Sequence, residues 1–368
     1  MAEKTVLIVG ASGVVGSAAV EHFLHSDAGW KVVAVSRRQP LVVSDRDFRH
    51  LAVDLRAPEA SRAALGELTG VTHVVYAALF EKPGLAAGWN DDDYRQINAG
   101  MLRNVLEPLI REARAPLEHV SLLQGAKAYG FHLGPMETPA RERQPRQQHE
   151  NFYWDQEDYV RDLASSEGCS WTVLRPHLIT GGSPGVAMNL PPVIGVYAAV
   201  CRQRGLEFGF PGGPAAPWES TDSRVVASAL EWCALDPAAR NETFNVTNGE
   251  VFGWRDLWPA IADALGLEPG GDTPHELGTF LPEAADEWRE IAARHDLVEP
   301  DVNRVLGESH YLADLVFAHG MSEMPPAAFE STVKIRRAGF ADCMDTEEMW
   351  SYWLGRLIEA RVIPGRDA

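Results

Sequence analysis

Two side chains in the sequence carry the groups that proton donation to a carbonyl oxygen requires. Tyr153 lies in residues 151–154 (NFYW), and Lys127 lies in residues 125–130 (GAKAYG). A phenol can donate a proton, and a neighbouring ammonium lowers the pKa of that phenol. No tyrosine in the chain is followed by a lysine four positions later, the spacing that pairs the two groups on one helix. The fold must therefore assemble the pair from separate segments. Otherwise the tyrosine is an ordinary core aromatic and the lysine a surface residue.

A glycine turn near the amino terminus indicates what such a pair would work beside. Residues 6–9 (VLIV) have the pattern of a buried parallel strand, and residues 17–23 that of a helix. Between them the glycines fall at i, i+3 and i+6, a spacing typical of short-chain dehydrogenases. It lets the backbone turn tightly and approach a pyrophosphate at a helix amino terminus. The sequence therefore predicts a dinucleotide site. Its expected contacts in the turn are Gly10, Ser12, Gly13, Val14, Val15 and Gly16.

The end of the second expected strand, residues 31–35, favours NADPH over NADH. A domain specific for NAD usually has an acidic residue there, which binds the ribose 2′-hydroxyl. This chain has Ser36, Arg37 and Arg38 instead. A guanidinium offers paired donors to phosphate oxygens and stays charged at every working pH, so it suits the 2′-phosphate of NADPH. The alternative interpretation is a solvated basic turn.

Three further strand ends supply the remaining expected cofactor contacts. An acidic side chain after the third strand can accept a hydrogen bond from the adenine amino group, or it is simply a polar strand end. Small residues after the fourth strand would let the backbone approach the ribose and the nicotinamide. A proline ends the strand at 172–175, where the nicotinamide face would lie. These expected contacts are Asp54, Leu55, Ala77, Ala78, Leu79, Pro176 and Ile179.

The composition restricts the classes of function. The chain has 368 residues and a formal net charge of −19. A polyanion needs a basic surface, so nucleic acid is not an expected partner. The four cysteines are widely separated and form no CxxC pair, so neither a metal site nor a disulfide framework is expected. No signal segment and no run of about 18 apolar residues occurs, so we expect a cytoplasmic protein that does not span a membrane.

Strand-like and helix-like runs alternate through the first half of the chain, which predicts right-handed βαβ units and a parallel sheet. The expected fold class is α/β: a Rossmann doubly wound parallel sheet with a smaller, mostly helical C-terminal part that binds substrate. We expect the NADP-binding Rossmann domain over residues 1–180, with a chain return around 221–248. The substrate-binding and capping part then comprises residues 181–220 and 249–368. Expected helices include 57–68, 93–114 and 224–235, and expected strands include 50–53 and 244–246.

Several longer motifs resemble one family, the progesterone 5β-reductase and iridoid synthase-like enzymes, an atypical branch of the extended short-chain dehydrogenases. The resemblance extends over nearly the whole chain. The residues 151–158 (NFYWDQED), in which a Glu-Asp pair follows the NFY motif, are its most specific part. The other motifs are residues 125–130, Arg175 and Pro176 with the turn at 182–185 (GSPG), residues 244–249 (FNVTNG) through Trp254, residues 256–259 (DLWP) and residues 331–340.

This resemblance implies an NADPH-dependent reductase of a C=C bond conjugated to a carbonyl group. In that family the tyrosine of the NFY motif, here Tyr153, stabilises the enolate oxygen while hydride reaches the β-carbon, and Lys127 is its catalytic partner. Plant members commonly have two consecutive tyrosines, whereas this chain has Trp154 at the second position. The expected substrate is a small hydrophobic enone, a class that includes Δ4-3-ketosteroids such as progesterone. A homodimer is compatible with the family.

The substrate pocket and the function have open alternatives at this stage. Each aromatic or apolar candidate for the pocket is explained better as core: Trp89, Phe131, Met188, Tyr197, Val200, Phe340 and Trp350. Met136, Trp154 and Phe210 are ambiguous in the same way. An NADP-dependent carbonyl reductase or an NAD-dependent epimerase of the extended short-chain type would use the same fold. Epimerases, however, normally keep the four-residue Tyr–Lys spacing. A regulator that binds NADP without turnover would tend to lose the tyrosine and the lysine, and both are present here.

Overall fold

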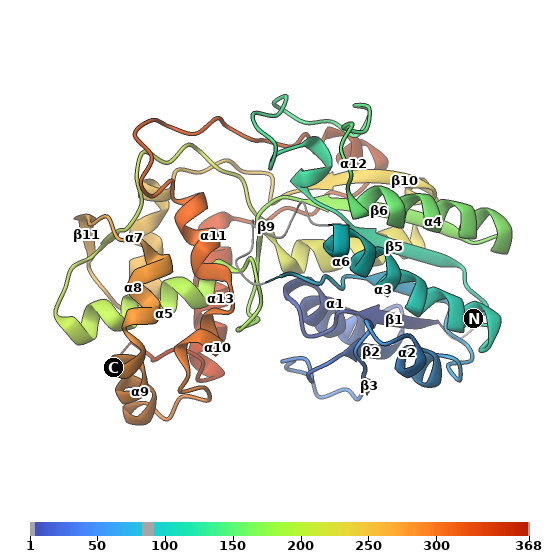
Figure 1. Ribbon diagram of the computed structural model, residues 1–368, viewed down its shortest axis with the longest axis horizontal. Helices are drawn as coiled ribbons and strands as arrows, with labels where there is room; N and C mark the ends of the chain where they lie inside the picture. Colours follow the sequence, from blue (N-terminus) through green and yellow to red (C-terminus); the bar gives the residue numbers. More distant parts are fainter. Residues whose placement is uncertain (1–3, 83–91, 367–368) are drawn as a thin grey trace.

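A seven-stranded parallel sheet forms the first part of the molecule, drawn from blue to green with β10 in yellow (Figure 1). The computed structural model describes residues 4–82 and 92–366. In these residues the strand order is β10-β6-β5-β4-β1-β2-β3, and all neighbouring pairs are parallel. This order, 3-2-1-4-5-6 with one added strand, is that of a doubly wound Rossmann sheet, so the expected fold class is confirmed. The strands are β1 (Thr5–Val9), β2 (Lys31–Ser36), β3 (Arg49–Ala52), β4 (His73–Tyr76), β5 (His119–Leu123), β6 (Ser170–Pro176) and β10 (Glu242–Val246).

Helices cover both faces of this sheet because the strands are apolar on both faces. In β1, Val6 and Ile8 pack against one helical layer, whereas Leu7 and Val9 pack against the other, as the two-residue repeat of a strand requires. Burying such a side chain fully stabilises the fold by roughly 1.5–3 kcal/mol. The first layer contains α1 (Val14–His25) and α6 (Ser223–Leu235), and the second contains α2 (Pro58–Leu65), α3 (Asp92–Arg111) and α4 (Phe152–Glu167).

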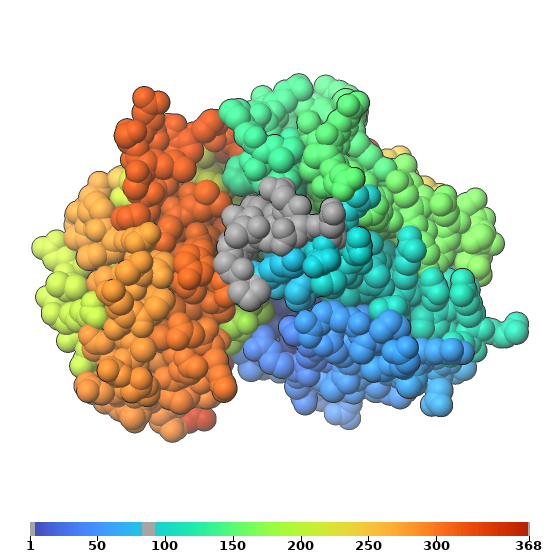
Figure 2. All heavy atoms as spheres, viewed as in Figure 1, coloured from blue at the N-terminus to red at the C-terminus, as the bar shows by residue number. Residues whose placement is uncertain are grey.

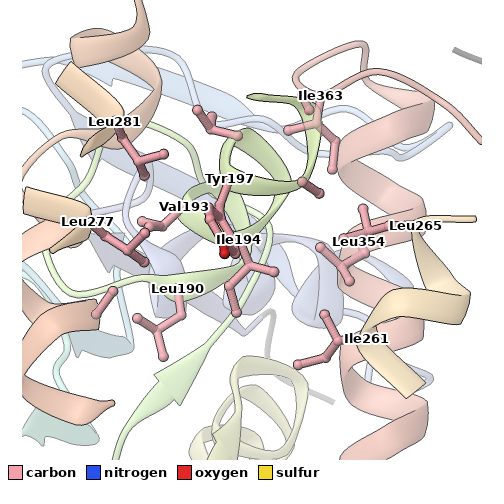
Figure 3. Packing of buried hydrophobic residues seen from close by; sticks show 14 of the residues in the cluster. Leu190, Val193, Ile194, Tyr197, Ile261, Leu265, Leu277, Leu281, Leu354 and Ile363 are labelled. Atoms are coloured by element: carbon pink, nitrogen blue, oxygen red, sulfur yellow. The ribbon is translucent and has the colours of Figure 1, made fainter. Parts of the chain in front are cut away.

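A mostly helical second part lies beside the sheet, at the left of Figures 1 and 2. Its centre is α5 (Leu190–Arg204), whose residues are buried from Leu190 to Cys201. Figure 3 shows Val193, Ile194 and Tyr197 of this helix among side chains from the surrounding helices. Those helices are α7 (Trp254–Ala264), α8 (Leu277–Glu283), α9 (Ala285–Arg294), α10 (Val302–Leu306), α11 (Ser309–Val316) and α13 (Thr346–Glu359), with the strand pair β8 (Phe208–Phe210) and β11 (Pro269–Asp272).

The chain crosses between the two parts several times. It leaves the sheet after β6 and returns through the pair β7 (Ile179–Thr180) and β9 (Thr221–Asp222) into α6. Near the carboxyl end, α12 (Val333–Ala338) packs on the sheet: Ile335 and Phe340 belong to the same hydrophobic cluster as Val246 of β10. Residues 333–340 therefore pack with the Rossmann part, although the sequence places them in the capping part.

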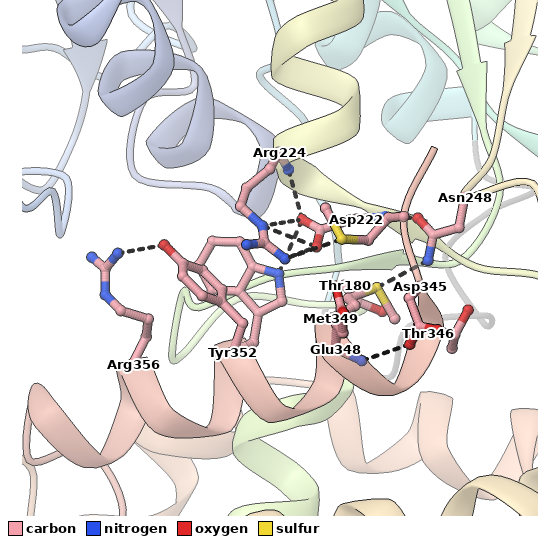
Figure 4. Close-up of polar contacts among 12 residues, drawn as sticks. Thr180, Asp222, Arg224, Asn248, Asp345, Thr346, Glu348, Met349, Tyr352 and Arg356 are labelled. Atoms are coloured by element: carbon pink, nitrogen blue, oxygen red, sulfur yellow. Dashed lines mark hydrogen bonds and ion pairs between the residues drawn. The ribbon is translucent and has the colours of Figure 1, made fainter. Parts of the chain in front are cut away.

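One buried carboxylate connects the two parts (Figure 4). Asp222, at the amino terminus of α6, is fully buried and accepts the backbone N–H of Arg224 at 2.8 Å. It also accepts the indole Nε1–H of Trp353, from α13, at 3.1 Å. The Arg224 guanidinium binds the same carboxylate and lies 3.7 Å from the centre of the Tyr352 ring. The carboxylate thus satisfies donors from both parts.

Several expectations from the sequence need correction. The expected helices at 57–68 and 93–114 end earlier, at Leu65 and Arg111. For four residues considered for the substrate pocket, burial confirms the preferred interpretation as core: Tyr197, Val200, Phe340 and Trp350. Trp89 lies outside the described residues.

The four cysteines are free thiols. Within the described chain, no helix has both the length and the apolarity needed to cross a membrane.

Candidate active site

The glycine turn between β1 and α1 has a geometry that only glycine satisfies. Gly10 has φ +86°, and a Cβ there would lie 2.6 Å from backbone atoms of Ala77 and Ala78. A Cβ on Gly16 would lie 2.1 Å from the carbonyl oxygen of Gly10. Gly10 therefore allows the turn to approach the end of β4, and Gly16 allows α1 to start directly against the turn. Gly13 N donates to Gly10 O at 2.9 Å and closes the turn.

This turn fits a dinucleotide. The first amides of α1 lack partners within the helix, as at every helix start, and no acidic side chain lies in the first turn of α1 to repel a phosphate. Ser12, Gly13 and Val14 are partly exposed, whereas Val15 and Gly16 are buried and can offer only backbone groups. A pyrophosphate would be held at this point by backbone N–H groups.

The capping part also contacts the turn, which the sequence analysis missed. Ser183 Oγ lies 3.0 Å from Ser17 Oγ of α1 and donates to Gly13 O at 3.2 Å. Ser183 belongs to the GSPG turn at 182–185, so a small polar residue in a glycine-rich turn was the available signal. These contacts place the chain after β6 directly beside the expected pyrophosphate site.

Of the three residues expected to bind the 2′-phosphate after β2, one is buried and two are exposed. Ser36 is buried, and its hydroxyl donates to Arg38 O at 2.6 Å, so its side chain is already hydrogen-bonded within the turn. Arg37 and Arg38 are exposed. Arg38 Nη2 lies 3.4 Å from Gly185 O, a long contact across to the GSPG turn. The two guanidiniums remain available to a ligand at the edge of the sheet.

The other expected cofactor contacts lie at the carboxyl ends of β3, β4 and β6. Hydrogen bonding with Arg56 lowers the pKa of Asp54 to about 2, and the charge of Arg37 adds to this effect. Ala77 N donates to Val9 O at 2.8 Å. The remaining expected contacts differ in exposure: Leu55 is buried, Ala78 and Ile179 are partly buried, and Leu79 is exposed, whereas Pro176 ends β6.

Tyr153 lies against Gly125, the residue that precedes the short helix carrying Lys127. Asn151 caps α4 by accepting the Tyr153 N–H at 3.0 Å, which fixes the first turn of the helix. A Cβ built on Gly125 would lie 3.7 Å from Tyr153 Oη and 3.3 Å from Pro176 O. Lys127 lies two residues further on, in the short 3-10 helix η2 (Ala126–Tyr129), which follows β5. The two segments that carry the phenol and the ammonium therefore meet at the carboxyl end of β5.

The pKa of Tyr153 differs from the expectation that a neighbouring ammonium lowers it. Burial lowers the pKa of Lys127 to about 8, an effect that the charge of Glu81 partly offsets. Burial also raises the pKa of Tyr153, and Glu81 raises it further, while Arg175 lowers it. The phenol is therefore a protonated donor at neutral pH rather than a phenolate. The pKa of Tyr153 shows no lowering from Lys127 in this structure.

Tyr129 and Trp154, the other aromatic residues near Lys127 and Tyr153 in the sequence, make different contacts. Tyr129 Oη donates to Asn245 Oδ1 at 2.5 Å and receives a bond from Arg175 at 3.2 Å, so this phenol connects η2 to β10 and β6. Trp154 lines a polar cavity of about 220 Å³ together with Arg146 and Glu157. Trp154 Nε1 is buried and has no hydrogen-bond partner among the described residues. Neither ring replaces Tyr153 at Gly125.

The sheet order, the glycine turn and its closeness to β4 define a nucleotide-binding Rossmann protein of the short-chain dehydrogenase type. Residues 6–364 match the family described as PRISE-like Rossmann-fold domain, and the chain belongs to that family. It is 31% identical to a 3-oxo-Delta(4,5)-steroid 5-beta-reductase of Arabidopsis thaliana, over 98% of this chain and 94% of the relative. It is 30% identical to an (S)-8-oxocitronellyl enol synthase of Antirrhinum majus, over 98% and 93%. The resemblance noted from the motifs is confirmed, and the chain is an oxidoreductase.

Solved structures agree on the fold. A UDP-glucose 4-epimerase from Thermotoga maritima, solved with UDP-glucose, has a TM-score of 0.65 at 16% identity, over 96% of this chain and 99% of that one. A UDP-glucose 4-epimerase from Thermus thermophilus, solved with NAD, has a TM-score of 0.61 at 19% identity, over 97% and 99%. At such identities the likeness shows the fold alone.

Proposed function

We propose that the protein uses NADPH to reduce the C=C bond of an α,β-unsaturated carbonyl compound. The observation that carries the proposal is the position of Tyr153 Oη at Gly125, beside the segment that carries Lys127. Both lie at the carboxyl edge of the sheet, where the glycine turn also lies, and ligands of doubly wound folds bind at this edge. A relative whose name describes reduction of a 3-oxo-Δ4,5-steroid supports the same chemistry.

The cofactor is held by the residues of the turn and the strand ends. Backbone N–H groups at the start of α1 bind the pyrophosphate, and Arg37 with Arg38 binds the 2′-phosphate. Asp54 and Leu55 would hold the adenine, while Ala77, Ala78 and Leu79 would let the backbone approach the ribose. Pro176 and Ile179 would contact the nicotinamide. When bound there, NADPH supplies a hydride.

The protein's own contribution to the reaction is electrostatic. Adding hydride to the β-carbon of an enone develops negative charge on the carbonyl oxygen, and a donor aimed at this oxygen stabilises the charge. The Tyr153 hydroxyl is that donor, and its raised pKa keeps the proton in place at neutral pH. Lys127, on the segment that meets Tyr153 at Gly125, adds positive charge to the same site. Because Lys127 is mostly buried and Tyr153 is partly buried, both interactions are stronger than they would be in solution.

The substrate is a hydrophobic enone. Phe131, which follows η2, is partly buried, and its ring lies 5.9 Å from that of His177 and 6.2 Å from that of Trp218. Phe131 and His177 follow the carboxyl ends of β5 and β6, and Trp218 precedes β9. An apolar carbon skeleton would pack against this cluster of three rings. A saturated ketone offers the same carbonyl oxygen but no acceptor carbon for hydride.

The test follows NADPH absorbance in the presence of a panel of cyclic and linear enones and the matching saturated ketones. We expect oxidation with enones and none with saturated ketones. Tyr153→Phe should lower kcat by roughly 100-fold or more with an unchanged Kd for NADPH, because the lost bond forms to developing charge. Tyr159→Phe, on the same helix, is the control and should retain activity.

Each other result identifies a different function. Oxidation with saturated ketones would indicate a carbonyl reductase, and tight NADPH binding without turnover would indicate a regulator. Full activity in Tyr153→Phe would remove this phenol from the mechanism.

A further inference from the structure

Four ionisable side chains from four different segments meet beside the candidate active site. They are Glu81, which follows β4, Tyr94 of α3, Lys127 of η2 and Tyr153 of α4. Tyr94 Oη donates to Glu81 Oε1 at 3.1 Å, and Lys127 Nζ lies 3.9 Å from the same oxygen. The ammonium lies 5.9 Å from the centre of the Tyr94 ring. Phe152 joins the two phenols, since its ring lies 5.4 Å from that of Tyr94 and 4.6 Å from that of Tyr153.

This cluster is shielded from solvent. The side chain of Lys127 is 15% exposed and that of Glu81 9% exposed, and Tyr94 is buried. At such depth a charge acts on its neighbours with little screening. The carboxylate of Glu81 therefore acts on three groups at once: it raises the pKa of Lys127 and contributes to the raised pKa of both phenols.

We propose that Glu81 is a positioning residue that keeps Lys127 in its ammonium form beside Tyr153. The inference rests on the proposed function for its catalytic meaning, but the ionisation of Lys127 can be measured without it. Burial alone favours a neutral amine, and a carboxylate about 4 Å away favours the cation. The hydrogen bond from Tyr94 holds the carboxylate at that place. Without Glu81, Lys127 would lose its charge at a lower pH, and the site would lose its ammonium group.

Other titratable groups around the pair do not replace this charge. His132 faces Lys127 from the segment after η2, but burial lowers its pKa to about 4, so it is neutral at pH 7. Arg175 of β6 and Glu330, which precedes α12, act on Tyr153. Arg175 is held by Gln124 and Tyr129, and burial raises the pKa of Glu330 well above its usual range. Among the described residues, the carboxylate of Glu81 is thus the anion that acts on the ammonium.

The experiment measures the pKa of Lys127 in the complex with NADP⁺ by NMR. The full sequence has five lysines, at positions 4, 31, 82, 127 and 334, so reductive ¹³C-methylation gives a small set of signals. Lys127→Arg assigns the signal of interest. We expect Glu81→Gln to lower the pKa of Lys127 by roughly one to three units. Glu81→Asp, which keeps the charge at a greater distance, should give an intermediate value. Glu107→Gln removes an exposed carboxylate from the nearby α3 and should leave the value unchanged.

The outcomes separate this inference from the proposed function. An unchanged pKa of Lys127 in folded Glu81→Gln, or in Glu81→Asp if the glutamine variant does not fold, overturns the role of Glu81 even if enones are reduced. A lowered pKa together with no enone turnover by the unmodified protein supports Glu81 and overturns the reductase. If both hold, the alkaline limb of the kcat/KM profile should move to lower pH in Glu81→Gln by the same number of units.

Discussion

At the scale of single residues, one carboxyl group that acts on Tyr153, that of Glu330, is in an unusual state. Glu330 is buried, and both its carboxyl oxygens lack a hydrogen-bond partner among the described residues. Its backbone N–H donates to Glu219 Oε1 at 2.5 Å, so a second buried carboxyl lies next to it. Burial raises the pKa of Glu330 well above its usual value, and Glu219 raises it further. Two adjacent buried carboxyls cannot both ionise cheaply.

This state of Glu330 makes the stability depend on pH. The folded protein holds a proton that the unfolded chain releases above about pH 4.5, so this residue makes folding less favourable as the pH rises. Glu330→Gln removes the effect. Its free energy of unfolding relative to the unmodified protein should increase between pH 5 and pH 8, by at most about 1.4 kcal/mol per pH unit. Urea denaturation at several pH values measures this difference. The control is the exposed Glu323→Gln. If the difference in free energy of unfolding between Glu330→Gln and the unmodified protein does not change with pH and equals that of the control, the raised pKa of Glu330 is contradicted.

The basic residues after β2 carry the cofactor preference at the same scale. Arg37 and Arg38 are exposed, so replacing both by alanine should change the fold little. The double variant should raise the Kd for NADPH by roughly 10-fold or more and that for NADH by much less, because charge-assisted bonds to phosphate are lost. Fluorescence titration with both cofactors measures the two constants. An equal loss for both would show that the guanidiniums do not bind the 2′-phosphate.

At the scale of elements, the positions of the reactive groups depend on how helices and strands begin and end. Asn151 caps α4 and so places Tyr153 in the first helical turn, next to the end of β5. Gly10 and Gly16 let α1 begin against β1 and β4. Asp222 caps α6 and at the same time receives the indole N–H of Trp353 from α13. A residue at the end of an element can therefore both cap its own helix and hydrogen-bond to another part of the molecule.

The joint at Asp222 can be tested for this double role. Asp222→Ala removes a helix cap and leaves the buried Trp353 N–H without its acceptor, so it should lower the free energy of unfolding by roughly 3–5 kcal/mol. Asp236→Ala is a matched control: Asp236 also accepts one backbone N–H and one indole N–H, from Ala238 and Trp232, but it is only partly buried. Its loss should be about 1 kcal/mol. Equal losses in urea denaturation would contradict a special contribution of the joint.

At the scale of the whole molecule, the formal charge of −19 acts on the compact state. Like charges repel each other in the folded protein more than in the expanded chain. The exposed ion pairs, such as that between Arg204 and Glu287, act in the opposite direction, but such pairs contribute little individually. Net repulsion should therefore dominate the response to salt.

Salt should stabilise the protein for this reason. Between about 10 and 300 mM NaCl at pH 8, the free energy of unfolding should rise by on the order of 1 kcal/mol, since screening weakens the repulsion. At about pH 5, where carboxylates begin to take up protons, the effect should shrink. Urea midpoints at both pH values measure it. A midpoint that falls with salt at pH 8 would mean that the ion pairs outweigh the net charge.

Much of the fold could be predicted from the sequence, because it depends on local patterns, whereas the expected cofactor contacts stay predictions. A β-branched run followed by glycines at three-residue steps determines a strand, a tight turn and a helix, and alternation of such units determines a parallel sheet. The presence of Arg37 and Arg38, rather than an acidic residue, after the second strand can also be read from the local sequence. The pair of Tyr153 and Lys127 was predicted from family motifs, and the roles of these two residues stay predictions.

The tertiary structure alone decided which distant groups share an environment. Gly125 and Tyr153 meet because β5 ends, and α4 begins, at the same edge of the sheet. Glu81 lies close to Lys127 because β4, which precedes Glu81, is the neighbour of β5, which precedes Lys127. Whether Phe340 lines a pocket or packs behind the sheet also depends on the path of the chain. The pKa values follow from these surroundings, since burial and neighbouring charge are properties of packing. Local pattern determined the elements, whereas long-range packing determined the chemistry that their ends can perform.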